Sequence, residues 1–143
     1  MRSGLLAIVV AVTVVACGHT SGGGSPRPTP NSVSDVTRAF AAHGVPLYQA
    51  FKNNKRLLRH LQVAAELGPS SKSSQDVLQT LNLIVVYYDP PHARLATIAT
   101  RRNSAKRGHD YRVRQFGNVI VTFDPHGRGV RQVRAAMAEL ETN

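Results

Sequence analysis

Two apolar stretches of strand length, each followed by Asp-Pro, constrain the fold of this chain more than any other feature. They are residues 83–88 (LIVVYY), ending before Asp89, and residues 119–123 (VIVTF), ending before Asp124. Continuous apolar runs of this length are typical of strands buried inside a sheet. Asp is a favoured helix N-cap and Pro fits the first helical turn, so each run predicts a strand followed by a helix.

The helices and the turn around these runs can be placed as well. Residues 111–116 and 119–123 flank Gly117-Asn118, which predicts a hairpin with a two-residue turn. We expect the helices that follow the two runs to bury these apolar residues: Leu95, Ile98 and Ala99 in the first, and Val130, Val133, Met137 and Leu140 in the second.

The first helix has end signals in the sequence. Ser32 and Asp35 have the spacing of a capping box. Gly44, followed by Val45 and Pro46, is typical of a helix that ends in a left-handed residue. The pattern therefore predicts a helix between Ser32 and Gly44, with a short strand within residues 45–51 after it.

A second helix is expected after Asn53 or Asn54, either of which can serve as its N-cap. Its apolar stripe would extend to Gly68-Pro69, and residues 70–75 would form a polar loop. The stripe consists of Leu57, Leu58, Leu61, Ala64, Ala65 and Leu67.

The order of elements predicts the fold class. Helix, strand and helix are followed by strand, helix, strand, strand and helix, in a single domain over residues 33–143. We expect an α+β fold, a small two-layer sandwich with a mixed sheet. Its C-terminal part resembles a ferredoxin-like βαββα unit.

The N-terminus begins with Arg2 and the uncharged run from Leu5 to Ala16. Twelve helical residues extend roughly 18 Å, well short of a hydrocarbon core of about 30 Å. The run is therefore too short for a permanent membrane span but has the length of a signal-peptide core.

The last four residues of this segment, Val14-Val15-Ala16-Cys17, resemble the lipobox of bacterial lipoproteins. This resemblance implies cleavage before Cys17, loss of residues 1–16 as a signal peptide, and a diacylglyceryl group on the Cys17 thiol that labelled palmitate would mark. Two acyl chains suffice for stable anchoring, so we expect the chain at the extracytoplasmic face of the cell membrane. An unlipidated secretory signal is the alternative.

Residues 17–32 are rich in Gly, Ser and Pro and are expected to form a flexible tether. The Arg-, Ala- and Val-rich remainder is similar to small uncharacterised lipoproteins of high-GC Gram-positive bacteria. That similarity implies no known activity.

The charge and the cysteine count limit the classes of partner. The net charge is +10, which favours anionic lipid, an acidic envelope polymer or an acidic protein. Nucleic acid is not expected as a partner outside the membrane. Cys17 is the only cysteine, so no intramolecular disulfide can form.

Basic clusters are the main candidate for an anionic-partner site. One lies within residues 52–59, and a second is spread over fourteen residues. Strand alternation places Arg112 and Arg114 on the face opposite Tyr111 and Val113, away from the proposed core. An ordinary solvated surface is the alternative for either cluster. The second cluster consists of Arg101, Arg102, Lys106, Arg107, Arg112 and Arg114.

The last helix has an unusual charge order. Arg128, Arg131 and Arg134 come early, whereas Glu139 and Glu141 lie near its end. This order opposes the helix dipole, and an anionic partner near the helix start would offset the cost.

The alternative function is a metal- or small-ligand-binding lipoprotein. His92 and His126 follow equivalent Asp-Pro turns, so the fold could bring both to one sheet edge together with Asp89 and Asp124. Helix capping by the two aspartates, with solvated histidines, competes with this interpretation.

Enzymatic signatures are absent from the sequence: it contains no nucleophile elbow, Gly-rich phosphate loop or His-Glu-x-x-His motif. A hydrolase of unfamiliar type remains open. We expect a non-catalytic binding or scaffold domain that needs no cofactor.

Overall fold

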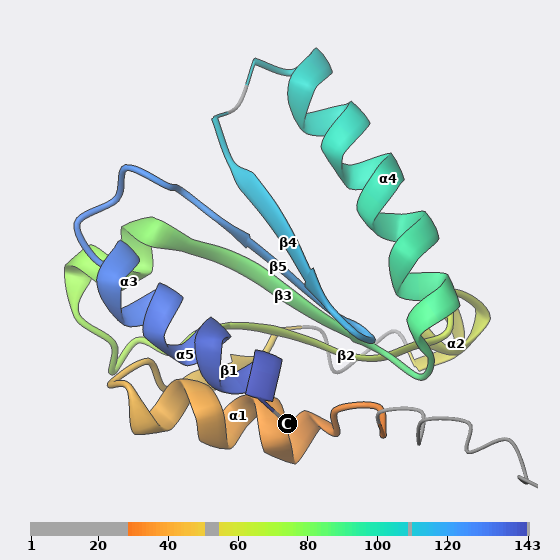
Figure 1. Ribbon diagram of the computed structural model, residues 1–143, viewed down its shortest axis with the longest axis horizontal. Coiled ribbons are helices and arrows are strands. Elements are labelled where there is room, and N and C mark those ends of the chain that lie inside the picture. Colours follow the sequence, from red (N-terminus) through yellow and green to blue (C-terminus); the bar gives the residue numbers. More distant parts are fainter. Residues whose placement is uncertain (1–28, 51–54, 109, 143) are drawn as a thin grey trace, which may run out of the picture.

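The computed structural model describes residues 29–50, 55–108 and 110–142 (Figure 1). Within these residues, helices and strands follow one another along the chain as α1 (Val33–Ala42), β1 (Leu47–Gln49), α2 (Lys55–His60), β2 (Val63–Pro69), α3 (Gln75–Thr80), β3 (Leu81–Tyr87), α4 (Pro90–Lys106), β4 (Arg112–Phe116), β5 (Val119–Phe123) and α5 (Val130–Thr142). The expected α+β class is confirmed.

The strands form one sheet in the order β1-β2-β3-β5-β4, and all neighbouring strands are antiparallel. The expectation of a mixed sheet is therefore wrong. Strands β3 and β4, which α4 connects, run in the same direction, but β5 folds back as a hairpin strand and lies between them. The expected βαββα order from β3 to α5 is confirmed.

Helices cover the two faces of the sheet differently. The main core lies between the sheet and helices α1, α3 and α5, and includes Phe40, Val77 and Met137. A smaller cluster on the opposite face joins Ala93 of α4 to Val113 of β4 and Ile120 of β5. Figure 1 shows α1 and α5 along one side of the sheet and α4 along the other. Strand β5 is consequently buried on both faces, as its apolar run predicts.

Helix α4 packs on the sheet through small residues. Its buried residues are Ala93 and Thr97, whereas Leu95 is 68% exposed and Ile98 is 51% exposed. The expectation that Leu95, Ile98 and Ala99 are buried is wrong. The apolar spacing of the sequence identifies a helix here, but the side that meets the sheet is the one with the small side chains.

Helix α1 begins and ends as its sequence predicts. The Ser32 hydroxyl accepts from the Asp35 backbone N–H, and the Asp35 carboxylate accepts from the Ser32 backbone N–H. The Ser32 hydroxyl also donates to the Asp35 carboxylate at 2.6 Å, and this hydrogen bond, followed by the one from the Ser32 backbone N–H, lowers the pKa of Asp35. At the other end, Gly44 adopts a left-handed φ of +74°, and the Val45 N–H donates to the Phe40 carbonyl at 2.9 Å.

The segment after β1 differs most from expectation. Helix α2 ends at His60, and the predicted continuation of its apolar stripe is strand β2. Gln62 has a φ of +59°, which turns the chain out of the helix. From Val63 to Leu67 burial alternates with a period of two, as a strand requires. Asn53 and Asn54, the expected caps, lie outside the described residues.

Asp89 and Asp124 have different roles. Asp89 is the N-cap of α4 and accepts from the His92 backbone N–H at 3.0 Å, as predicted. Asp124 does not cap α5, which starts six residues later; its carboxylate accepts from the His126 backbone N–H at 2.8 Å and closes a turn. The capping prediction for Asp124 is therefore wrong.

The loop between β5 and α5 is held against α3, a helix that was not expected from the sequence and that begins at the end of the expected polar loop at residues 70–75. The buried Thr80 hydroxyl accepts from the Gly129 backbone N–H at 3.1 Å. Gly127 approaches so closely that an added Cβ would clash with the Thr80 Oγ1. Residue 127 must therefore be glycine. Because the loop is held in this position, α5 does not begin until Val130.

Candidate functional site

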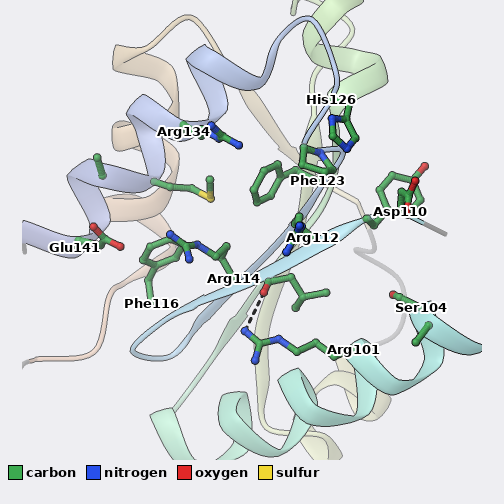
Figure 2. A pocket seen from close by; sticks show the side chains of 16 residues that line it. Arg101, Ser104, Asp110, Arg112, Arg114, Phe116, Phe123, His126, Arg134 and Glu141 are labelled. Atoms are coloured by element: carbon green, nitrogen blue, oxygen red, sulfur yellow. Dashed lines mark hydrogen bonds between the residues drawn. The ribbon is translucent and has the colours of Figure 1, made fainter.

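A basic groove follows the edge strand β4. It has a volume of about 1000 Å³ and is bounded by α5 on one side and by the C-terminal half of α4 on the other. Figure 2 shows Arg134 and Glu141 of α5 on one side of β4, and Arg101 and Ser104 of α4 on the other side. We call this the β4 groove.

Strand register explains why Arg112 and Arg114 line the β4 groove. Arg112 pairs with Phe123 and Arg114 pairs with Val121, and paired residues in antiparallel strands project to the same face. Phe123 and Val121 belong to the main core. The expected alternation with Val113 is confirmed, because Val113 is buried on the other face.

The expectation that Arg112 and Arg114 point away from the core is wrong. They lie on the same face as the main core, and they remain exposed because β4 is the last strand of the sheet and they lie beside α5 rather than beneath it.

One of the two arginines of α5 completes the cationic lining. Arg134 is exposed and lines the same groove as Arg112 and Arg114. The ion pairs of the described residues are Arg38–Asp35, His43–Glu139 and His92–Asp89, and none of them involves these three arginines. Their charges are therefore available to a ligand.

The unusual charge order of α5 is partly explained by its neighbours. Glu139, near the helix end, lies 3.1 Å from the ring Nε2 of His43, the C-cap residue of α1. Arg134, in the first half, points into the β4 groove. An anion bound there would offset the unfavourable interaction of Arg134 with the positive end of the helix dipole.

The floor of the groove is apolar. Phe116, Phe123 and Met137 line it, and all three are almost fully buried in the main core. Two carboxylates also line the groove, Asp110 before β4 and Glu141 near the end of α5. Arginines around an apolar floor suit a ligand that carries negative charge on an extended body with some apolar surface.

Arg101 connects the groove to α4. Its Nη2 donates to the backbone carbonyl of Val113 at 3.0 Å, on the side of β4 that has no neighbouring strand. The rest of the predicted cluster lies elsewhere: Arg102, Lys106 and Arg107 are exposed at the end of α4 and do not line the groove. The structure thus brings together three of the six predicted residues, namely Arg101, Arg112 and Arg114.

The structure separates His92 and His126. Strands β3 and β5 are antiparallel, with Leu81 opposite Phe123, so the turns that follow them lie at opposite ends of the sheet, about 17 Å apart along the strands. The expectation that both histidines share one edge is wrong. Within residues 29–50, 55–108 and 110–142, no group of three or more His, Cys, Asp or Glu residues could hold a metal ion.

Each histidine instead belongs to a local contact. The His92 ring lies 2.7 Å from the carboxylate of Asp89, whose pKa is lowered first by the backbone N–H of His92 and then by its ring. His126 lines the β4 groove. Among the described residues, the His126 ring has no hydrogen bond to a carboxylate or a hydroxyl.

Sequence reasoning missed two parts of the groove. The charge order of the last helix singles out Arg134, but the sequence does not indicate that Arg134 lies near Arg112 and Arg114. Nor does it indicate that His126 lies beside these arginines. Cys17 lies outside the described residues. No helix in the described part of the chain is long and apolar enough to cross a membrane.

Comparisons with known proteins gave no relative: no family model, no curated protein and no solved structure matches this chain.

Proposed function

We propose that this chain is a lipid-anchored, extracytoplasmic lipoprotein whose folded domain binds an extended anionic partner in the β4 groove without catalysis. The observation that carries the binding proposal is the set of Arg112, Arg114 and Arg134 around one apolar floor, with no ion pair to a described carboxylate. The anchor rests on the lipobox-like sequence that ends at Cys17.

Several observations support binding over catalysis. The groove is broad and follows a whole strand, which suits a chain-like ligand better than a small substrate. Arg112, Arg114 and Arg134 come from elements that the main core holds in place, β4 and α5. Within the part of the chain that the structure describes, the ring of His126 makes no hydrogen bond that would orient it as a general base.

The test measures binding of a fluorescein-labelled hexaglutamate peptide to the full chain in neutral detergent, by fluorescence anisotropy. Arg112→Gln together with Arg114→Gln removes two groove charges. The matched control, Arg102→Gln with Arg107→Gln, removes two exposed charges outside the groove.

Two exposed contacts of about 0.7 kcal/mol each correspond to roughly a tenfold change in Kd. We therefore expect the groove pair to weaken binding about tenfold and the control pair to have a much smaller effect, with both effects reduced by salt. Equal weakening by the two pairs would show that only net charge matters, and would refute the groove as the site.

A further inference from the structure

The outer side of α4 has a composition that is unusual for a solvated helix. Leu95 and Ile98 are 68% and 51% exposed. At helical spacing, the same line of residues continues with Arg102 and Lys106, which are also exposed. We call Leu95, Ile98, Arg102 and Lys106 the α4 outer face.

This face is exposed because the inner side of α4 needs only small residues. Ala93 and Thr97 are buried against the sheet, and Ala96 packs beside them. The large apolar side chains are therefore not required for the core of the described domain. A surface helix normally presents polar residues on the side away from the sheet, so two adjacent large apolar side chains there indicate contact with something outside the domain.

The charge around these apolar residues has one sign. The sequence of α4 contains no Asp or Glu, and its cations are Arg94, Arg101, Arg102 and Lys106. The neighbouring carboxylate, Asp89, is the N-cap and is already paired with the His92 ring.

Two further apolar side chains are exposed near the start of α4. Tyr88, directly before the N-cap, is 54% exposed, and its backbone N–H donates to the Gln62 carbonyl at 2.9 Å. This bond brings the end of α2 next to the start of α4, and Leu61 there is 51% exposed. Helix α2 likewise contains no acidic residue.

We propose that the α4 outer face docks on an anionic lipid bilayer, with Leu95 and Ile98 at the level of the acyl boundary and Arg102 and Lys106 against the headgroups. Apolar side chains flanked by cations, without carboxylates, are the features of helices that lie in the membrane interface. The charge also argues against a second copy of this chain as the occupant, because two such faces would place arginines and lysines opposite one another.

This inference is separate from the β4 groove. Arg112, Arg114 and Arg134 lie on β4 and α5, and Arg101, which α4 contributes to the groove, donates to the Val113 carbonyl of β4. The docking residues project instead from the side of α4 that faces away from the sheet. Docking can therefore fail while hexaglutamate binding in the groove persists, and the reverse also holds.

The absence of tryptophan from this chain provides a direct assay. In the full chain, Ile98→Trp introduces a single reporter on the α4 outer face. Ala41→Trp introduces the control reporter at an exposed position of α1, on the opposite side of the sheet. Both variants are mixed with phosphatidylcholine vesicles that contain brominated acyl chains, with or without phosphatidylglycerol.

We expect the emission of the Ile98→Trp variant to shift to the blue and to lose about half its intensity on phosphatidylglycerol vesicles at low salt. The Ala41→Trp variant should show neither effect. Adding Arg102→Gln and Lys106→Gln to the Ile98→Trp variant should lower the docking equilibrium constant about thirtyfold, or five- to sixfold per residue. The matched pair Arg128→Gln and Arg131→Gln should leave it unchanged.

Three results would overturn the proposal. They are equal quenching at positions 98 and 41, equal quenching of the Ile98→Trp variant with and without phosphatidylglycerol, and a blue shift without vesicles in a chain that light scattering shows to be dimeric. The last would identify a second copy as the occupant. If the far-UV circular dichroism of the Ile98→Trp variant differs from that of the parent chain, Leu95→Trp replaces it, since position 95 is still more exposed.

Discussion

Replacing Thr80 by Val tests how the wall of the β4 groove is held. Thr80 is fully buried, and its hydroxyl accepts from the Gly129 N–H while donating to the Asp76 carbonyl at 2.6 Å. Val keeps the shape of the side chain but leaves the Gly129 N–H buried without an acceptor, which costs about 1–3 kcal/mol. At this chain length we expect the melting temperature to fall by roughly 4 °C for each kcal/mol.

Thr97→Val is the matched control. Thr97 is 3% exposed, and its hydroxyl donates to the Ala93 carbonyl four residues earlier, as Thr80 does to Asp76. No hydrogen bond links the Thr97 hydroxyl to another segment of the described chain. Its replacement removes only a hydrogen bond to a carbonyl that already accepts one within the helix. We therefore expect a much smaller loss in the free energy of unfolding.

The assay is urea unfolding of the full chain in neutral detergent, followed by far-UV circular dichroism, with the slope m compared between variants. We expect a lower midpoint for Thr80→Val at unchanged m. Equal losses in Thr80→Val and Thr97→Val would refute the argument that the contact with Gly129 holds the loop between β5 and α5.

Three further predictions concern the cap of α4, the end of α1 and the anchor. The lowered pKa of Asp89 implies a stabilising contribution that is complete above its ordinary value of 3.8 and is lost as the pH falls through the lower folded value, so acid unfolding should be less steep in Asp89→Asn. Gly44→Ala places a Cβ at a φ of +74° and should cost about 1 kcal/mol in the same urea assay, whereas no loss would contradict the left-handed helix end. Cys17→Ala should release the chain from the membrane fraction or leave it uncleaved, and should abolish palmitate labelling; unchanged processing and labelling would exclude the anchor.

Local signals in this sequence predict local structure well. The capping box at Ser32, the left-handed end at Gly44 and the hairpin at Gly117 are all present, because the interactions that define them lie within a few residues. The two apolar runs are strands β3 and β5, as predicted: every residue of β5 is buried, whereas buried and less buried residues are mixed along β3.

The errors arise where two patterns share the same residues. Residues 57–67 satisfy a helical stripe when read together, yet from Val63 onward they also alternate, and pairing of β2 with both β1 and β3 favours the strand. Leu95 and Ile98 have the spacing of a buried helix face, but spacing does not show which side the sheet covers. Asp124 has the sequence of a cap, and the contact between Thr80 and Gly129, 49 residues apart, makes it a turn residue instead.

The candidate site was predictable only in part. Arg112 and Arg114 were identified from their cluster, and the alternation of β4 follows from the sequence. Their proximity to Arg134 depends on the place of β4 at the edge of the sheet and on the packing of α5 against the same face. Both features depend on contacts between distant parts of the sequence, so no short sequence pattern predicts them.

The position of Arg101 over the outer side of β4 has a consequence for crowding. An edge strand exposes backbone groups that can pair with the edge of another molecule and begin aggregation. Here the Val113 carbonyl already accepts a hydrogen bond from the Arg101 guanidinium, and Arg112 and Arg114 are the neighbours of Val113 in the strand. A second copy adding its own β4 would have to displace that guanidinium and set like charges opposite each other, which is destabilising. Copies of this chain at high concentration are thereby kept from pairing through their β4 edges.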